Sequence, residues 1–139
     1  MQNSFKPVQL LLSLHAQGRF AEMEQRAREL LRGNGNVPIL NELLGISLSG
    51  QKKYSDALPF LQKAVRREPN DALFWENLAL CQRELGEYAH AEKSLRQSLK
   101  IRPANAEALN TLGSVLRSQE RTDEARAALR TAQAEAELA

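Results

Sequence analysis

Two stretches of this chain, EPNDALFWENLA (68–79) and RPANAEALNTLG (102–113), resemble each other residue by residue. Their prolines, Pro69 and Pro103, are 34 residues apart. Self-similarity at such a fixed period is the sequence signature of a repeat protein. With the proline at position 32 of each repeat, the chain divides without any insertion into four units: 4–37, 38–71, 72–105 and 106–139.

Equivalent columns of the four units carry the same kinds of residue. Position 7 is leucine in every unit: Leu10, Leu44, Leu78 and Leu112. Position 8 is Leu11 in the first unit and a small residue in the last three: Gly45, Ala79 and Gly113. Position 20 is Met23 in the first unit and alanine in the last three: Ala57, Ala91 and Ala125. Because short side chains allow two helices to cross closely, we expect each unit to be a pair of packed helices.

The third unit shows both helices of the expected pair. A first stripe at helical spacing contains Trp75, Leu78, Ala79 and Gln82. After a break at Gly86 and Glu87, a second stripe contains Tyr88, Ala91, Leu95 and Leu99. Each unit is too small to bury its apolar face alone, so we predict an all-α fold in which neighbouring units stack. In that fold Trp75 is a packing residue rather than a platform for a ligand.

The spacing W-x2-L-small in 75–79, with Ala91, Leu95 and Pro103 after it, resembles the tetratricopeptide repeat family. The likeness covers 4–139, with departures where the family has tryptophan or tyrosine: Pro7, Asn41, Leu109 and Gln82. The resemblance implies a single domain over 1–139, an α-solenoid wound as a right-handed superhelix. It also implies that the first helices of the repeats line a concave groove, which holds a peptide or helix of a partner protein.

The candidate groove residues lie on the first helices, opposite the core stripe. They are largely aliphatic in the first two units and polar in the fourth: Val8, Leu12, Ile39, Glu42, Leu43, Ile46, Leu73, Glu76, Asn77, Leu80, Arg83, Asn110, Ser114 and Arg117. One interpretation is a trough for an amphipathic helix or an extended peptide with apolar anchors. The alternative is that the aliphatic residues pack between neighbouring first helices.

Two signatures within the family bear on the ligand. Chaperone-binding members clamp a terminal carboxylate with Lys, Asn and Arg, but the matching positions here include Val8, Leu12, Glu107 and Thr111. We therefore expect no chaperone tail as ligand. A ladder of asparagines at position 6, typical of repeats that precede O-linked N-acetylglucosamine transferases, is reduced here to Asn77.

The segment 8–31 is similar to the N-terminal repeats of bacterial proteins of this family that carry a glycosyltransferase or sulfotransferase domain. A second hypothesis is therefore a substrate-recruiting segment of such a transferase. The fourth unit reaches residue 139 without the polar capping helix that solenoids normally need. We expect either a fragment of a longer protein or self-association, as a homodimer or a scaffold, through the uncapped fourth repeat.

Composition argues against several other classes of protein. The 19 basic and 17 acidic residues are interleaved and leave a net charge of +2, so no strong field favours nucleic acid. No apolar run approaches the ~20 residues of a membrane span, and a secretory signal is missing, which favours the cytoplasm. His15 and His90 lie far apart from each other and from the single Cys81, so they form no metal-ligand set. Without a phosphate loop or a nucleophile–base set, we expect a binding module with no catalytic activity and no cofactor.

Overall fold

The structure is a computed structural model that describes residues 5–34 and 37–138. Within these ranges the chain forms eight helices and contains no strand: α1 (Phe5–Ala16), α2 (Phe20–Asn34), α3 (Pro38–Gly50), α4 (Tyr54–Arg67), α5 (Ala72–Glu84), α6 (Tyr88–Ile101), α7 (Ala106–Ser118) and α8 (Thr122–Leu138). The predicted all-α class is confirmed. Each of the four predicted repeats encloses one pair of consecutive helices.

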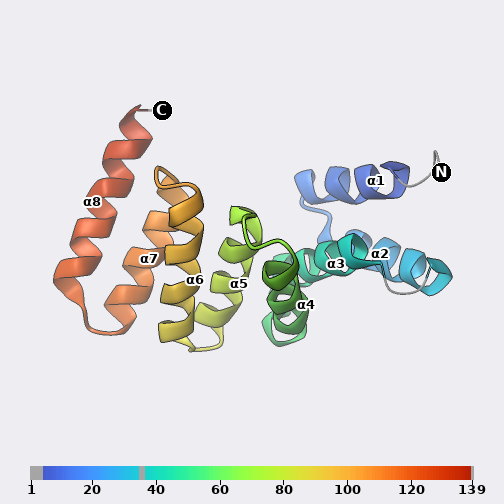
Figure 1. Ribbon diagram of the computed structural model, residues 1–139, viewed down its shortest axis with the longest axis horizontal. Coiled ribbons are helices and arrows are strands. Elements are labelled where there is room, and N and C mark those ends of the chain that lie inside the picture. Colours follow the sequence, from blue (N-terminus) through green and yellow to red (C-terminus); the bar gives the residue numbers. More distant parts are fainter. Residues whose placement is uncertain (1–4, 35–36, 139) are drawn as a thin grey trace. The chain divides into compact units, whose positions relative to one another are not determined.

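The chain divides into two compact units, residues 1–66 and 67–139. The first unit holds α1, α2, α3 and all but the last residue of α4, and the second holds α5 to α8. In the second unit each helix contacts the next one along the chain, and α5 also contacts α7. Figure 1 shows these four helices side by side in chain order. The grouping of all four repeats into one domain stays a prediction.

The ends of the helices follow from local residue chemistry. Asp71 and Asn105 precede α5 and α7, and each side chain accepts hydrogen bonds from the first free backbone N–H groups of its helix. The second residue after each first helix has a positive φ angle: Gly18, Lys52, Gly86 and Glu120. This left-handed conformation ends the helix and turns the chain toward the second helix of the pair.

The expected close crossing of the two helices of a repeat is confirmed where position 8 is glycine. A Cβ atom on Gly45 would lie 2.8 Å from Cβ of Phe60, and one on Gly113 would lie 2.8 Å from Cγ of Leu129. Neither position leaves room for a larger side chain without movement of the neighbouring helix. In the first repeat the same columns hold Leu11 and Met23, and both side chains are fully buried.

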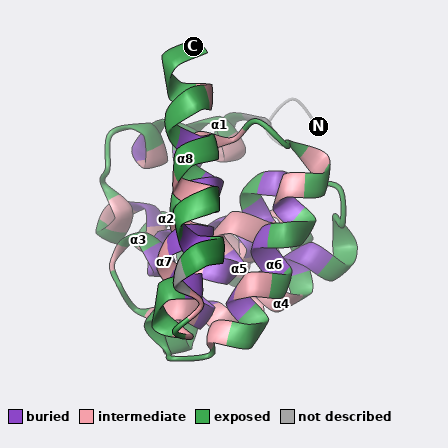
Figure 2. Cartoon of the chain, turned by 90° about the vertical axis from the view of Figure 1, so that its left-hand side faces the viewer, coloured by how far each residue is buried: buried purple, intermediate pink, exposed green. Residues whose placement is uncertain are grey.

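The core of the second unit is built by the alternating small and large residues that the repeat pattern predicts. Its members are Ala79, Ala91, Leu95, Ala108, Leu112, Val115, Leu116 and Ala125, with Tyr88 and Leu99 packed against them. The outermost helix, α8, buries only Ala125 and Ala132 among its described side chains, and Figure 2 shows it mostly exposed. An apolar stripe on one side of each helix therefore accounts for how α5 to α8 associate.

Trp75 is less buried than its place in the core stripe predicts. Leu78, Ala79 and Gln82, which share the stripe, are buried, whereas Trp75 is half-buried. Its indole Nε1–H donates a hydrogen bond of 2.8 Å to the carbonyl oxygen of Pro69. The tryptophan thus fastens α5 to the segment that precedes it.

Within each unit, a half-buried glutamate on the second helix of one repeat forms hydrogen bonds to the next repeat. In the first unit, Glu24 of α2 accepts hydrogen bonds at 2.8, 2.8 and 3.1 Å from three side chains: Arg28, Gln51 and Lys53. In the second unit, Glu92 of α6 accepts hydrogen bonds at 3.0, 3.2 and 2.6 Å from Arg96, Gln119 and Arg121. We name these sets the Glu24 cluster and the Glu92 cluster. Their members correspond one to one at a spacing of 68 residues, which is two repeats.

Candidate functional site

The first helices of the second unit, α5 and α7, contact each other directly and present most of the polar candidate residues. On α5, Leu73 is 46% exposed, and the other four candidates are half-buried: Glu76, Asn77, Leu80 and Arg83. On α7, Ser114 is half-buried, and Asn110 and Arg117 are exposed. We call these eight residues the α5–α7 face. The structure brings them together on two helices in contact, with side-chain surface left for a ligand.

The α5–α7 face is positioned by the residues that cap its two helices. Asn105 accepts hydrogen bonds from the backbone N–H groups of Glu107 and Ala108 through Oδ1. Its Nδ2 donates a hydrogen bond of 2.6 Å to Oε1 of Glu76 on α5. One asparagine therefore ends the loop before α7, begins that helix and ties it to α5. This contact fixes the spacing of the two helices at the start of α7.

Glu76 carries the electrostatic feature of this face. Burial raises the pKa of its carboxyl above the usual value, the hydrogen bond from Asn105 lowers it, and the negative charge of Glu107 raises it further. The net result is a raised pKa. A cationic group of a ligand placed beside Glu76 would stabilise the ionised carboxylate, so this position favours a positively charged contact over a negative one.

Asn77 and Arg83 of the α5–α7 face each interact with a neighbouring residue and keep hydrogen-bonding capacity for a ligand. Asn77 donates through Nδ2 to the backbone carbonyl of Leu73 at 3.0 Å, which directs its Oδ1 away from that bond as an acceptor. Arg83 pairs with Glu84 at 2.8 Å. Amide and guanidinium groups alternate here with the leucines Leu73 and Leu80. Such a surface can bind a peptide backbone by hydrogen bonds and its aliphatic side chains by contact.

The candidate residues of the first unit differ from those of the second in how far they are buried. On α1, Leu12 is 50% exposed and Val8 is half-buried, and on α3, Ile39 is half-buried. The next three candidates on α3 are buried: Glu42, Leu43 and Ile46. All residues of α3 from 42 to 49 are buried, so beyond Ile39 this helix offers a ligand almost no side-chain surface. The accessible candidates of this unit are therefore Val8, Leu12 and Ile39.

Residues outside the candidate groove also behave in ways that the columns do not predict. Leu10 belongs to the core column at position 7, yet it is 42% exposed. Its exposure could have been anticipated from the large residues Leu11 and Met23 in columns that are small elsewhere. His15 packs edge-to-face on Phe20 with ring centroids 5.7 Å apart, and Cys81 is fully buried.

The described helices include none that is long and apolar enough to cross a lipid bilayer. Likewise, the described residues contain no group of three or more His, Cys, Asp or Glu side chains arranged to hold a metal ion. The features that the described part of the chain does offer are helix surfaces and shallow pockets.

The family profile of the tetratricopeptide repeat matches residues 42–105 and again 82–139. Together the two matches span well over half of the chain, which therefore belongs to the tetratricopeptide repeat family. The resemblance drawn from the 34-residue period is confirmed. A comparison with curated proteins finds no match, and the similarity of 8–31 to transferase-linked repeats stays a prediction.

Several solved structures share this fold. MamA from Desulfovibrio magneticus RS-1 superposes with a TM-score of 0.84 at 18% identity, over 94% of this chain and 74% of that one. MamA of AMB-1 gives a TM-score of 0.83 at 20% identity, over 96% and 79% of the two chains. YrrB, a TPR protein with an unusual peptide-binding site, gives 0.78 at 22% identity, over 88% and 63%. These similarities establish an all-α helical repeat solenoid.

Proposed function

We propose that the protein is a non-catalytic interaction module that binds a peptide or helix of a partner protein on its α5–α7 face. The observation that carries the proposal is the spacing of Leu73, Glu76, Asn77 and Leu80 along one side of α5. This i, i+3, i+4, i+7 stripe keeps solvent-accessible surface, although its ends are leucines. A stripe of that kind on a helix that already buries its opposite side supports a docking surface for a partner.

The chemistry of the face supports a peptide over a small molecule. Leu73 and Leu80 are two turns apart, which is the distance between aliphatic side chains on a bound helix or a short extended segment. Asn77 and Asn110 offer amide groups for the backbone of such a segment, and Glu76 favours a basic side chain near the start of α7. The peptide-binding site named for YrrB is a property of that protein, but its shared fold makes a peptide a reasonable ligand class here.

The first unit contributes a smaller part to this proposal. Val8, Leu12 and Ile39 keep accessible surface and are proposed as additional aliphatic contacts. Glu42, Leu43 and Ile46 would reach a ligand only after α3 is uncovered, so the proposal does not use them.

The test begins with random peptides displayed on phage and selected on the full chain. The best peptide is then titrated against single variants of the α5–α7 face. Leu73→Glu and Leu80→Glu each place a charge where an aliphatic contact is proposed, and we expect each to weaken binding about tenfold or more. Leu85→Glu, an equally drastic change at an exposed leucine just beyond α5, is the matched control and should bind like the wild type.

Circular dichroism must show the same helicity for all three variants. A selected peptide that binds equally well to Leu73→Glu, Leu80→Glu and the unchanged protein would place the ligand elsewhere and reject this face.

A further inference from the structure

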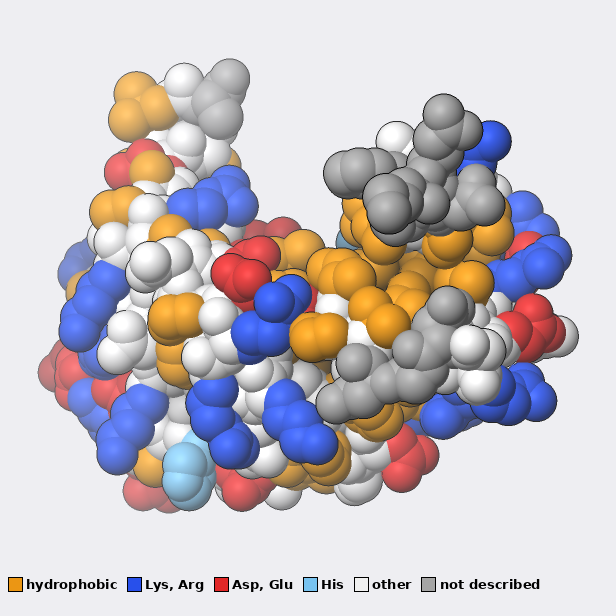
Figure 3. All heavy atoms as spheres, turned by 45° about the vertical axis from the view of Figure 1, so that its right-hand side comes forward, with side chains coloured by type: hydrophobic (Ala, Val, Ile, Leu, Met, Phe, Trp, Pro, Cys, Tyr) orange, Lys and Arg blue, Asp and Glu red, His pale blue; other side chains and the backbone are white. Residues whose placement is uncertain are grey.

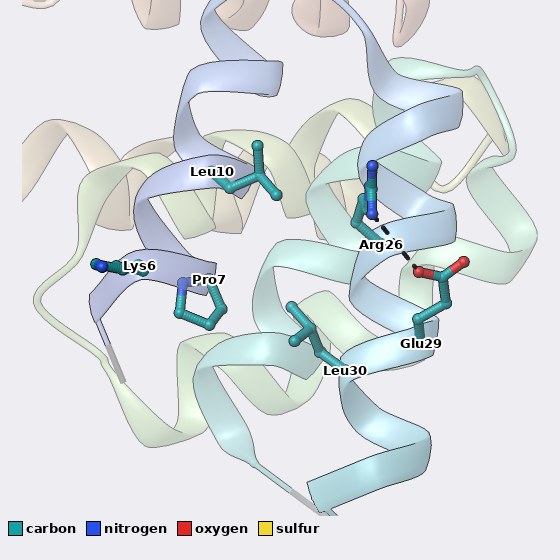
Figure 4. Close-up of a pocket in the computed structure, with 6 residues that line it drawn as sticks. All are labelled: Lys6, Pro7, Leu10, Arg26, Glu29 and Leu30. Carbon is teal, nitrogen blue, oxygen red and sulfur yellow. Dashed lines mark ion pairs between the residues drawn. The ribbon is translucent and has the colours of Figure 1, made fainter. Parts of the chain in front are cut away.

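The first repeat contains a pocket between its two helices. It lies between α1 and α2 and has a volume of about 430 Å³. Six side chains line it: Lys6, Pro7, Leu10, Arg26, Glu29 and Leu30. Figure 4 shows Pro7 and Leu10 on α1 facing Leu30 on α2, with the pair Arg26 and Glu29 beside them. The volume lies within the range of pockets that hold ligands.

The pocket has a cause in the sequence. In the last three repeats, positions 8 and 20 are glycine or alanine, and the two helices of a repeat come close together. In the first repeat these positions hold Leu11 and Met23, whose side chains occupy the crossing point and are fully buried. Since two large residues at a crossing hold the helix axes apart, the rest of the interface cannot close.

The exposed fraction of the leucine at position 7 shows that the two helices of the first repeat pack less closely than those of the other repeats. Leu44, Leu78 and Leu112 are only 2%, 3% and 4% exposed, because they pack inside their own repeats. The equivalent Leu10 is 42% exposed. A residue that forms the core of every other repeat therefore lines an open pocket in the first one, together with Pro7 and Leu30.

The charges around the pocket indicate the occupant. Lys6 is exposed and pairs with no acidic residue that the structure describes. Arg26 faces Glu29 at 4.0 Å, the outer limit of an ion pair, so its positive charge is only loosely balanced. The polar rim thus carries a net positive charge over an aliphatic floor. Figure 3 shows the same combination at this side of the first unit, where hydrophobic side chains gather next to Lys and Arg.

We propose that this pocket binds an acidic segment of a partner protein, which inserts an aliphatic side chain between α1 and α2 and places an Asp or Glu carboxylate beside Lys6. The site differs from the surface proposed above. Leu10 is two residues from both Val8 and Leu12, so it points about 160° away from them around the helix axis. The two proposals therefore involve opposite faces of α1 and fail or succeed separately.

The probe is a pair of short peptides, acetyl-Glu-Leu-Leu-Glu-amide and acetyl-Lys-Leu-Leu-Lys-amide, titrated against the full chain. Backbone amide resonances are followed by NMR. We expect the acidic peptide to shift resonances of α1 and α2 and to bind at least about tenfold more tightly than the basic one. Lys6→Glu and Leu10→Glu should each weaken the acidic peptide about tenfold.

Leu85→Glu is the matched control, since it adds the same charge to an exposed leucine that belongs to neither proposed binding site. It should leave the affinity within about twofold of the wild type. If Leu10→Glu loses helicity, Lys6→Glu alone decides, because Lys6 is exposed and its replacement disturbs no packing.

Several results would overturn the proposal. One is equal affinity for the two peptides, and another is unchanged affinity in Lys6→Glu. Binding of octanoate without binding of the acidic peptide would assign the pocket to a free aliphatic acid instead. Shifts of the α1 and α2 resonances on dilution of the protein alone would assign it to a second copy of the chain.

Discussion

Arg121 donates a hydrogen bond of 2.6 Å from Nη1 to Oε1 of Glu92, and this contact joins the turn between α7 and α8 to the second helix of the preceding repeat. Lys53 meets Glu24 in the same way in the first unit, at 3.1 Å. Both carboxylates are largely shielded from solvent, with side-chain exposures of 14% for Glu92 and 16% for Glu24. Shielded, several-fold hydrogen-bonded carboxylates contribute more to stability than isolated surface ion pairs do.

The first prediction concerns Glu92. Glu92→Gln keeps the size of the side chain but removes the charge that Arg96, Gln119 and Arg121 share. We expect a loss of about 1–2 kcal/mol in the free energy of unfolding, measured by urea denaturation. Glu87→Gln removes the same charge from an exposed residue whose side chain makes no capping hydrogen bond, and should change stability by less than about 0.5 kcal/mol. Equal effects of the two substitutions would reject the Glu92 cluster as a stabilising link.

The second prediction concerns the pH dependence of the Glu24 cluster. The hydrogen bond from Arg28, followed by that from Gln51, lowers the pKa of Glu24 from 4.5 to about 2. A folded-state pKa below the unfolded value means that the carboxylate stabilises the fold at neutral pH. That stabilisation is complete above pH 4.5 and disappears as the pH falls toward 2.

Thermal unfolding of the wild type and of Glu24→Gln between neutral pH and pH 2 checks this sign. The midpoint temperatures should differ at neutral pH and converge in acid. A difference that stays constant down to pH 2 would mean that ionisation of Glu24 does not contribute.

The third prediction concerns the positive-φ residue in the turn after each first helix. Gly18 and Gly86 adopt positive φ without cost, whereas Glu120 adopts φ 62° with a side chain that disfavours it. Glu120→Gly should therefore stabilise the protein by about 1 kcal/mol. The reciprocal change, Gly86→Ala, should destabilise it by a similar amount, since a Cβ there meets no atom within 4 Å and only the backbone conformation is strained. Chemical denaturation of both variants tests the pair, and a destabilised Glu120→Gly would contradict it.

The 34-residue period is sufficient to predict the helix pairs, because each column records which side of a helix must be buried. The caps agree with it: Asp71 and Asn105 occupy the same position of consecutive repeats and both begin a first helix. The distance between two helices depends on the sizes of the residues at positions 8 and 20 taken together. The pocket at Leu10 depends on the combined volume of Leu11 and Met23, which no single column reveals.

The accessibility of the candidate groove residues follows less directly from the sequence than the fold does, for a different physical reason. Helical spacing places Glu42, Leu43 and Ile46 on the side of α3 away from its core stripe, but it does not say what covers that side. The sequence PILNELLGISLSG has a single charged residue, and a helix that is apolar all round is normally buried. On α5 the candidate side chains keep accessible surface, and their place in a binding groove stays a prediction.

The fourth prediction concerns Trp75, whose indole N–H donates to Pro69 and whose ring is half-buried. Trp75→Phe removes the hydrogen bond but keeps most of the ring, so we expect a loss of about 0.5–1.5 kcal/mol. Trp75→Ala also removes the packing of the ring, and its cost should exceed that of Trp75→Phe. Complete burial would make the alanine variant cost ~3–5 kcal/mol, and half-burial places it below that range.

Urea denaturation of both Trp75 variants measures these losses, and titration with the selected peptide separates scaffold from ligand contact. Because Trp75 lies outside the Leu73, Glu76, Asn77 and Leu80 stripe, Trp75→Phe should bind that peptide within about twofold of the wild type. A variant that keeps its stability but loses the peptide would make Trp75 a ligand contact after all. We expect reduced stability with unchanged affinity, which would mean that Trp75 stabilises the contact between α5 and Pro69 and does not bind the peptide.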